Sequence, residues 1–484
     1  MKEYLTLTEI QGDLRERDLT CVQLVDHYLD RISSQAHLNA FVDVYAEEAK
    51  ESAIRIDEKI KNGTAGRLAG LVIGIKDVLS HQGHGLQAGS QILKSYQAPY
   101  TATAVQRLLD QDAIVIGRQN CDEFAMGSSN ENSSLGPVLN AADNSKVPGG
   151  SSGGSAVAVQ AGLCHASIGS DTGGSVRQPA AFCGVVGLKP SYGRVSRWGL
   201  IAYASSFDCV GPITKSVEDA ALILEIIAGA DDFDSTVSDK PVPSYSTTPA
   251  FTGKTRIGYM KEALESESLA PEIRKNTLDV LNRLKEEGHD VQPVEMSLLK
   301  YLLPTYYILT TAEASSNLSR FDGVRYGHRS SESVDLESLY KKSRTEGFGD
   351  EVRKRILLGT FVLSANYYDA YYTKAQRVRR LVREETSRFF GQFDFFISPV
   401  TPTTAFTLGE KSEDPLQMYL ADIFTVQANV VGYPAISIPN GVDGNGMPIG
   451  VQVMASSFEE EKLLSFTSYL TGITKEHKLI VSEQ

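Results

Sequence analysis

The sequence is poor in cysteine and tryptophan. Its 484 residues include five cysteines and one tryptophan. The cysteines are odd in number and no two of them form a Cys-x-x-Cys pair, which excludes a disulfide framework and a cysteine-based zinc site as the basis of the fold. We therefore expect a protein of the reducing cytoplasm with no bound metal.

Long apolar runs and an excess of positive charge are also absent. No apolar stretch approaches the roughly 18 residues that a membrane-spanning helix needs, and residues 1–4 are polar, unlike a signal peptide. We expect no membrane association. The net charge of −13 repels phosphate groups, so we do not expect this chain to hold nucleic acid by itself. A short basic stretch, residues 377–380, could contact an acidic partner, although a solvated helix face is the simpler interpretation.

Apolar periodicities of strands and helices alternate along most of the chain. This alternation indicates an α/β fold with a central, largely buried sheet. We expect one large domain over residues 1–484, with an N-terminal helical region at about 1–65 and a mostly helical insert at about 297–390. The expected strands are 71–75, 113–117, 164–169, 185–188, 256–260, 290–294, 393–400, 435–439 and 449–455. The expected helices include 20–33, 45–62, 101–111, 152–163, 216–228, 271–287 and 458–472.

A glycine-rich run, Gly149–Ser155, is the first motif with possible chemistry. It contains the Gly-x-Ser-x-Gly pattern of α/β-hydrolases, but that pattern requires a strand directly before it, whereas residues 140–148 have a turn composition. A Ser–His–Asp triad in that fold would also need a late histidine, and only His477 is available. The run is not a phosphate-binding loop, because no Gly-Lys-Ser/Thr follows. By itself it would most simply be a flexible turn.

A second glycine turn, Asp171–Ser175, follows an expected strand and precedes a short helix. The backbone N–H groups of Thr172, Gly173, Gly174 and Ser175 can converge on one point, as in an oxyanion hole. Glycine permits such close approach to a substrate, because it has no Cβ. Ser175 at the rim of this turn is a plausible nucleophile if another group takes its proton.

Lys76, at the end of an apolar strand, is the candidate base. Burial disfavours the ammonium form, and lowering the pKa from about 10.4 by roughly 3 units costs about 4 kcal/mol, which is within the known range for buried lysines. Neutral Lys76 could accept a proton from Ser151, which would relay it from Ser175. Taken alone, Lys76 beside Asp77 would more simply be a salt-bridged lysine.

Together, these motifs resemble the amidase signature family, whose members use a Ser–cisSer–Lys triad. Ser175 lies 24 residues after Ser151 and 99 after Lys76, which fits that family. The resemblance covers nearly the whole chain and implies a large mixed central sheet flanked by helices on both faces. Within the family, the stretches 122–129, 175–180, 314–326 and 419–425 resemble the A subunits of bacterial amidotransferases that act on Glu-tRNA(Gln) and Asp-tRNA(Asn).

The resemblance also implies roles for the motif residues. Ser175 would be acylated by glutamine. Ser151, which would follow a cis peptide bond in the chain, would transfer the proton, and Lys76 would be the base. The backbone of the turn that contains Thr172, Gly173 and Gly174 would form the oxyanion hole.

The same resemblance implies a substrate site made of Tyr306, Arg355 and Asp422. An aspartate suits the substrate's ammonium group, and an arginine can bind a carboxylate through two hydrogen bonds. Tyr307 is adjacent to Tyr306, so the choice between these two tyrosines stays open.

The implied function is that of a glutaminase subunit in a heterotrimer. Ammonia would pass to a B subunit that binds tRNA and uses ATP and Mg²⁺, and a small C subunit would complete the complex. This chain itself would need no cofactor. Two alternatives remain: a free-standing amidase that acts on another small amide, and a non-catalytic scaffold in which the glycine turns are structural. The sequence does not distinguish Glu-tRNA from Asp-tRNA as the final substrate.

Overall fold

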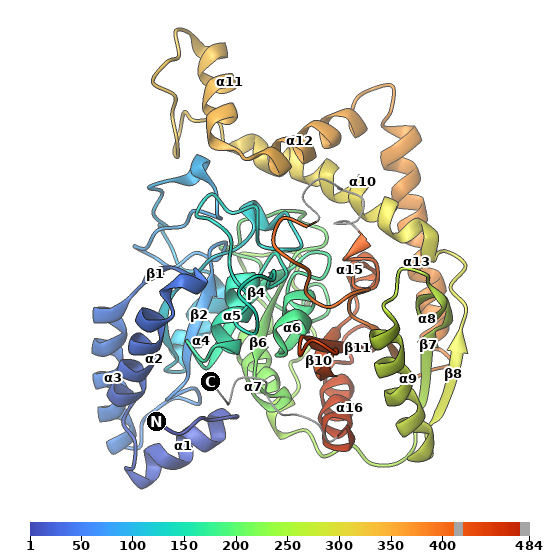
Figure 1. Cartoon of the computed structure of the whole chain (residues 1–484). Coiled ribbons are helices and arrows are strands. Elements are labelled where there is room, and N and C mark those ends of the chain that lie inside the picture. Colours follow the sequence, from blue (N-terminus) through green and yellow to red (C-terminus); the bar gives the residue numbers. More distant parts are fainter. Residues whose placement is uncertain (411–419, 475–484) are drawn as a thin grey trace.

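The computed structural model describes residues 1–410 and 420–474, and within these ranges eleven strands form one sheet (Figure 1). The strand order is β1-β3-β2-β4-β6-β5-β10-β11-β9-β7-β8. Strand β2 runs parallel to β3 and β4, and β7 runs parallel to β8 and β9, whereas the other neighbouring pairs are antiparallel. The strands are β1 (Phe41–Val44), β2 (Val72–Lys76), β3 (Ile114–Gln119), β4 (Ala166–Asp171), β5 (Val186–Lys189), β6 (Cys209–Thr214), β7 (Arg256–Met260), β8 (Asp290–Val294), β9 (Phe395–Pro399), β10 (Ala435–Val442) and β11 (Pro448–Met454).

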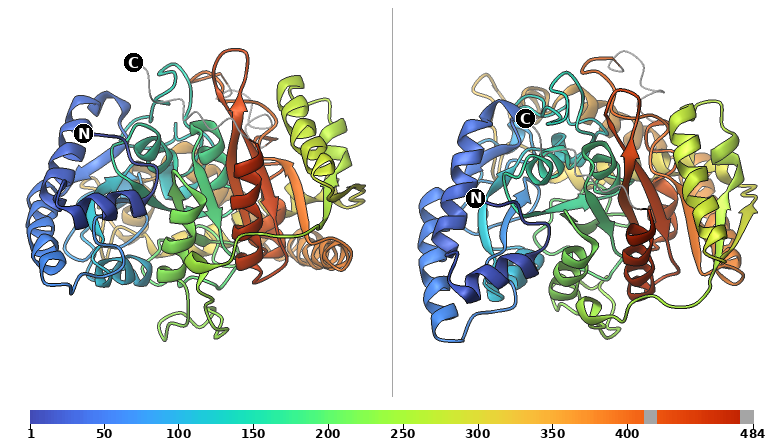
Figure 2. Two further views of the ribbon diagram at one scale, coloured as in Figure 1. Left: turned by 90° about the horizontal axis from the view of Figure 1, so that it is seen from below. Right: turned by 60° about the horizontal axis from the view of Figure 1, so that its bottom comes forward.

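Helices cover both faces of this mixed sheet, so the expected fold class is confirmed (Figure 2). The α-helices are α1 (Leu7–Glu16), α2 (Cys21–Ser34), α3 (Ala46–Lys61), α4 (Thr103–Asp110), α5 (Gly153–Gln160), α6 (Arg177–Cys183), α7 (Val217–Ile227), α8 (Lys261–Glu265), α9 (Pro271–Glu286), α10 (Leu299–Asn317), α11 (Leu336–Gly347), α12 (Asp350–Val362), α13 (Lys374–Phe390), α15 (Val426–Val431) and α16 (Glu460–Ile473). Among these residues, no helix is long and apolar enough to cross a membrane.

Two strands and three helices were not expected from the sequence. Strand β6 was missed because it contains Gly211 and Pro212, which usually mark turns. Pro212 is tolerated beside β5 because the β5 ladder reaches only Ile213 and Thr214. The edge strand β1 is short and does not alternate between buried and exposed residues, so it carries no periodic signal. Helices α8 and α15 are too short to show a period, whereas α1 was missed although a capping box marks its start.

The helices α10 to α13 lie together at one end of the molecule, and α11 extends farthest from the sheet (Figure 1). Helix α10 packs against α12 and α13. This group brings Tyr306 on α10 and Arg355 on α12 close to the loops that follow the central strands.

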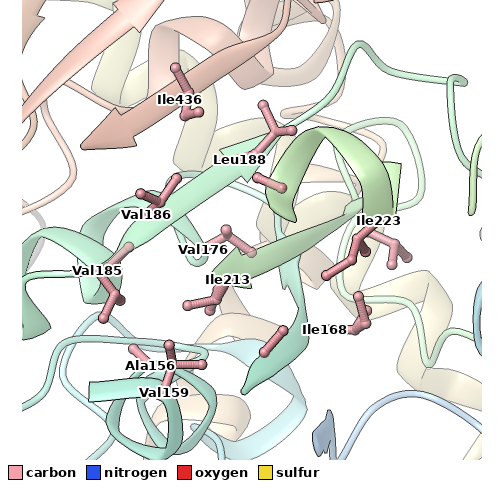
Figure 3. Packing of buried hydrophobic residues seen from close by; sticks show 14 of the residues in the cluster. Ala156, Val159, Ile168, Val176, Val185, Val186, Leu188, Ile213, Ile223 and Ile436 are labelled. Atoms are coloured by element: carbon pink, nitrogen blue, oxygen red, sulfur yellow. The ribbon is translucent and has the colours of Figure 1, made fainter. Parts of the chain in front are cut away.

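The main hydrophobic core is a large cluster that includes residues from Tyr4 to Leu470, and a second, small cluster surrounds Phe182 and Phe406. Figure 3 shows the centre of the main cluster, where Val176 lies among Val186, Leu188 and Ile213. Val176 is completely buried and directly follows Ser175. The core therefore fixes the backbone of the second glycine turn from its C-terminal side.

Candidate active site

Lys76 lies at the end of β2 and is completely buried. Its Nζ donates hydrogen bonds to Ser151 Oγ at 2.7 Å and to Ser170 Oγ at 3.0 Å. Burial lowers the pKa of Lys76 from 10.5 to about 8, and nearby acidic groups, including Asp122, partly oppose this. The pKa of Lys76 is thus lowered, as expected from the sequence, but by less than the expected amount.

The alternative interpretation of Lys76 as a partner of Asp77 is wrong. Asp77 instead accepts a hydrogen bond from Arg118 Nη1 at 2.9 Å, and its carboxylate also accepts the backbone N–H groups of Gln87 and Gly89. The Asp77 carboxylate thus accepts hydrogen bonds from groups other than Lys76, and the lysine side chain is directed to Ser151 and Ser170.

The first glycine turn holds Ser151 beside Lys76. The Gly150–Ser151 peptide bond is cis. The Gly150 N–H donates to Gln178 Oε1 at 2.9 Å, and the Ser151 carbonyl accepts from the Asp122 N–H at 3.2 Å. A Cβ on Gly150 would collide with the Asp122 carboxylate, so glycine is required at this close approach.

The second glycine turn lies against the first, because the Ser152 N–H donates to the Ser175 carbonyl at 3.1 Å. Asp171 ends β4, and its carboxylate accepts the N–H groups of Gly174 at 2.9 Å and Val176 at 3.2 Å. Within residues 1–410 and 420–474, the N–H groups of Thr172, Gly173 and Ser175 make no hydrogen bond. The structure thus differs from the sequence expectation at one position: the Gly174 N–H is already used by Asp171.

Ser175 is 8% exposed as a whole residue, and its Oγ makes no hydrogen bond to the described part of the protein. Ser151 Oγ accepts from Lys76 and lies in the adjacent turn. The structure therefore brings Lys76, Ser151 and Ser175 into one place, with the Lys76–Ser151 hydrogen bond formed and the Ser151–Ser175 hydrogen bond not formed.

A buried ion pair anchors the second turn. Arg177 Nε and Nη2 each donate to the Asp171 carboxylate at 3.0 Å, and both side chains are completely buried. Burial alone would raise the pKa of Asp171, but the Arg177 guanidinium outweighs this effect and lowers it to about 2. The remaining guanidinium hydrogens are bound by Thr425 O, Asn429 Oδ1 and Gln452 Oε1. The turn is thus tied to the C-terminal part of the sheet.

Tyr306 and Asp422 flank the Gly173 side of this turn. Tyr306 is buried, and a Cβ on Gly173 would collide with its hydroxyl group. Thr425 Oγ1 donates to Gly173 O at 2.6 Å, which holds the segment that contains Asp422 against the same turn. Ser128 Oγ donates to Asp422 Oδ2 at 2.6 Å. Burial raises the pKa of Asp422 to about 7, although Ser128 and the charge of Arg355 lower it.

Arg355 is buried on α12, where its Nη1 donates to Tyr203 Oη at 2.7 Å and its Nε donates to Glu351 Oε1 at 2.8 Å. Its guanidinium lies 5.6 Å from the centre of the Tyr203 ring and 5.5 Å from that of the Tyr307 ring. The two tyrosines therefore differ: Tyr306 faces the glycine turn, and Tyr307 lies over the arginine.

Glu123 was not singled out as a site residue from the sequence. It is buried, and it accepts hydrogen bonds from the Gly349 N–H at 2.9 and 3.2 Å and from Ser90 Oγ. Gly349 is the residue before α12, so Glu123 fixes the start of the helix that holds Arg355. Burial raises the pKa of Glu123 to about 7. The signal for it was available, since Glu123 lies within the 122–129 stretch.

Two features of the sequence do not belong to this site. In the basic stretch 377–380, Arg379 turns inward and donates to Ser206 and Val430, whereas Arg380 pairs with Glu384 on the surface. His477 and Tyr419 lie outside the described residues.

Comparison with known proteins places this chain in a family. Residues 23–464 match the family model described as Amidase. The chain belongs to the amidase family. Its amidase relatives include the A subunit of the glutamyl-tRNA(Gln) amidotransferase of Koribacter versatilis, which is 50% identical over 466 residues, or 95% of this chain and 96% of the relative. The corresponding protein of Chlorobaculum parvum is 49% identical, over 97% of this chain and 98% of the relative.

Solved amidase structures agree with this assignment. The crystal structure of the glutamyl-tRNA(Gln) amidotransferase A subunit from Thermotoga maritima is 38% identical and covers 94% of both chains, with a TM-score of 0.74. A structure described as an amidase is 30% identical with a TM-score of 0.82, and it covers 96% of this chain and 99% of its own. Within the amidase family, the chain therefore belongs with the amidotransferase A subunits.

Proposed function

We propose that this chain is the glutaminase subunit of a tRNA-dependent amidotransferase. The observation that supports this most is the hydrogen bond from buried Lys76 to Ser151, formed beside Ser175 in a chain about 50% identical to amidotransferase A subunits. A lysine whose pKa is lowered to about 8 is partly neutral near physiological pH, as a general base must be.

In the proposed reaction, Ser175 Oγ attacks the side-chain amide carbon of glutamine. Its proton passes to Ser151 Oγ while the Ser151 proton passes to neutral Lys76, and the Ser151–Ser175 hydrogen bond forms on substrate binding. Catalytic hydrogen bonds are often long or absent before the substrate is bound. The C–N bond then breaks, the amide nitrogen takes the proton back from the Lys76–Ser151 pair, and ammonia leaves. Water, activated by the same pair, hydrolyses the glutamyl ester on Ser175 to glutamate.

The tetrahedral oxyanion is bound by the free N–H groups of Thr172, Gly173 and Ser175 in this proposal. The N–H of Gly174 positions the turn through Asp171 and does not contact the oxyanion. Asp422 holds the substrate ammonium, Arg355 holds the carboxylate and Tyr306 closes the pocket beside Gly173. Since an ammonium favours the charged carboxylate, substrate binding will lower the pKa of Asp422 from about 7.

The relatives are named as A subunits of an amidotransferase, which supports a complex with further subunits. We propose the following roles for those partners. A B subunit receives the ammonia, binds the misacylated tRNA and uses ATP and Mg²⁺, and a small C subunit completes a cytoplasmic heterotrimer in protein biosynthesis. The net charge of −13 agrees with tRNA being held mainly by the partner.

The experiment that tests this function follows the transfer of the amide nitrogen from glutamine labelled with ¹⁵N at that position. We expect the co-purified complex to transfer the label to Glu-tRNA(Gln) or Asp-tRNA(Asn) when ATP and Mg²⁺ are present. The alternative of a free-standing amidase is favoured by the 0.82 TM-score to a solved amidase. It predicts instead that the chain purifies alone, ignores glutamine and hydrolyses other amides.

Glu123 provides a further prediction, because it supports Arg355 from outside the pocket. At pH 8, where Glu123 is ionised, we expect Glu123→Gln to raise KM for glutamine about ten-fold and to change kcat less than about two-fold. The start of α12 loses its carboxylate anchor and Arg355 shifts. The amide 4-aminobutanamide has the reacting group of glutamine but lacks the α-carboxylate. The wild type and Glu123→Gln should therefore hydrolyse it with the same kinetics.

Glu346→Gln is the matched control. Glu346 is an exposed glutamate on the neighbouring helix α11, bound to His328 and Ser330. Its replacement should leave the hydrolysis of both substrates unchanged. If Glu123→Gln instead impairs glutamine and 4-aminobutanamide equally, Glu123 does not act through Arg355.

A further inference from the structure

A His-x-x-His turn, His81–His84, lies against helix α3. His81 and His84 belong to the segment that follows β2, and Glu48 belongs to the first turn of α3. One ligand atom from each of these three side chains lies within 4.8 Å of the other two. His84 Nε2 is 2.9 Å from Glu48 Oε2. Three groups that can bind a metal thus converge from two separate elements.

The backbone holds both histidines in place. The His84 N–H donates to His81 O at 3.1 Å, which closes the turn. The Gly83 N–H donates to Ala98 O at 2.9 Å, and the Ala98 N–H donates to His84 O at 2.8 Å. Gly83 has φ +82°, a conformation that favours glycine. The imidazole groups are therefore presented by a fixed turn, which reduces the entropy lost when a ligand binds.

Two buried polar atoms in this cluster lack a partner. His81 is 7% exposed, and its Nδ1 makes no hydrogen bond within residues 1–410 and 420–474. The same is true of Tyr45 Oη. The Tyr45 ring lies 3.9 Å from the His84 ring, and the two histidine rings are stacked at 4.4 Å. An unpaired buried polar atom is costly, so the cluster is incomplete as a purely structural feature.

The local charge suits a cation. Arg118 is nearby, but its guanidinium is balanced by Asp77 at 2.9 Å and Asp43 at 3.9 Å. Glu48 thus contributes a negative charge to the cluster.

We propose that Glu48, His81 and His84 bind one Zn²⁺ ion. Two imidazole nitrogens and a carboxylate oxygen are a known zinc ligand set, in which water takes the fourth position. Ligand atoms around tetrahedral zinc are about 3.3 Å apart, given bond lengths of about 2.0–2.1 Å. Small side-chain rotations of Glu48, His81 and His84 must therefore bring their ligand atoms closer together than in this structure. The ion would join α3 to the segment directly after Lys76 and so link the N-terminal helices to the catalytic strand. The sequence alone does not indicate this site, because Glu48 lies 33 residues before His81.

The test is zinc titration of the full chain without a histidine tag, followed by calorimetry. We expect one equivalent of Zn²⁺ to bind to the wild type, and the affinity to fall at least about ten-fold in His81→Ala and in His84→Ala. His328→Ala is the matched control: His328 pairs with Glu346 at 2.6 Å without belonging to the described three-residue cluster, and its loss should leave the titration unchanged.

Thermal unfolding gives a second readout that does not depend on activity. Zn²⁺ should raise the Tm of the wild type and of His328→Ala, because it binds the folded state, and should not raise the Tm of the other two variants. Equal zinc affinity in the wild type and a folded His81→Ala, His84→Ala double variant would overturn the proposal. Circular dichroism of the variants checks that they are folded.

Discussion

Replacement of Ser175 by alanine is expected to lower glutamine hydrolysis by about 10⁴-fold or more. The reason is chemical, because removal of the nucleophile removes the acyl-enzyme pathway as a whole. The fold should be unaffected, since Ser175 Oγ makes no hydrogen bond to the described protein and the adjacent Val176 stays buried. Ammonia release and the thermal midpoint, measured on the same samples, check both parts of the prediction.

The matched control for this substitution is Ser155→Ala. Ser155 lies near the first glycine turn, on α5, and its buried Oγ has no hydrogen-bond partner among the described residues. Its loss should change ammonia release by less than about two-fold. Hydroxylamine adds a further check, because it attacks the acyl-enzyme and releases glutamyl hydroxamate from the wild type. Hydroxamate formation by Ser175→Ala at the wild-type rate would show that another residue is acylated.

Replacement of Lys76 by methionine is expected to remove activity and to stabilise the fold at the same time. General-base catalysis contributes roughly 10²–10⁴ in rate, and the loss should fall in this range or above, because Lys76 serves both acylation and deacylation. The folded protein at pH 7 carries a desolvated ammonium whose pKa is lowered by burial from 10.5 to about 8, a cost of about 3 kcal/mol. Lost hydrogen bonds to Ser151 and Ser170 offset part of the gain, so we expect about 1–3 kcal/mol in denaturant unfolding.

The pH dependence of this gain has a definite sign. Below pH 8 both the folded and the unfolded wild type are protonated at Lys76, and the whole cost is present. Between pH 8 and 10.5 the unfolded state binds more protons, so the wild type gains stability as pH rises. Above 10.5 both states are neutral, so the advantage of Lys76→Met from the removed ammonium disappears and only its lost hydrogen bonds to Ser151 and Ser170 remain. A stability difference that is the same at pH 7 and pH 10.5 would contradict the lowered pKa.

Activity should follow the same ionisation. In the wild type, kcat/KM is expected to rise with pH through a midpoint near 8, as Lys76 becomes neutral in the free enzyme. Asp422, with its pKa raised to about 7, adds a step at lower pH, because it must be charged to hold an ammonium. The residual activity of Lys76→Met should retain the lower step and lose the upper one.

Lys76, Ser151 and Ser175 could be predicted as site residues from the sequence, because local sequence patterns mark all three. Lys76 ends an apolar strand, and both serines lie in glycine turns whose flanking strand and helix were expected at nearly their observed positions. The resemblance to the amidase signature family then indicated that Lys76, Ser151 and Ser175 act together as a triad. The Gly174 N–H makes a hydrogen bond that was not expected from the sequence, because it donates to the carboxylate of Asp171, three residues earlier. This competition is a known property of aspartate at turns.

The order of the strands could not be obtained in the same way. Strands β10 and β11 lie between β5 and β9, although about 250 residues separate β5 from β10 in sequence. Nothing in an apolar run identifies so distant a partner. The 122–129 stretch marked Glu123 as a candidate but not its role, which comes from Gly349. The contact of Ser170 with Lys76 was likewise not predictable. In both pairs the partners are remote in sequence and adjacent only in the folded protein.

The Arg177 anchor has a consequence for biosynthesis. Ribosomes make proteins from the N-terminus, so Lys76, Ser151 and Ser175 emerge long before the groups that hold Arg177, namely Thr425, Asn429 and Gln452. Until those groups are present, the guanidinium and its turn have no complete set of partners. In a nascent chain the turn that contains Ser175 is therefore not fully assembled, and we expect no glutamine hydrolysis until nearly the whole polypeptide has been synthesised.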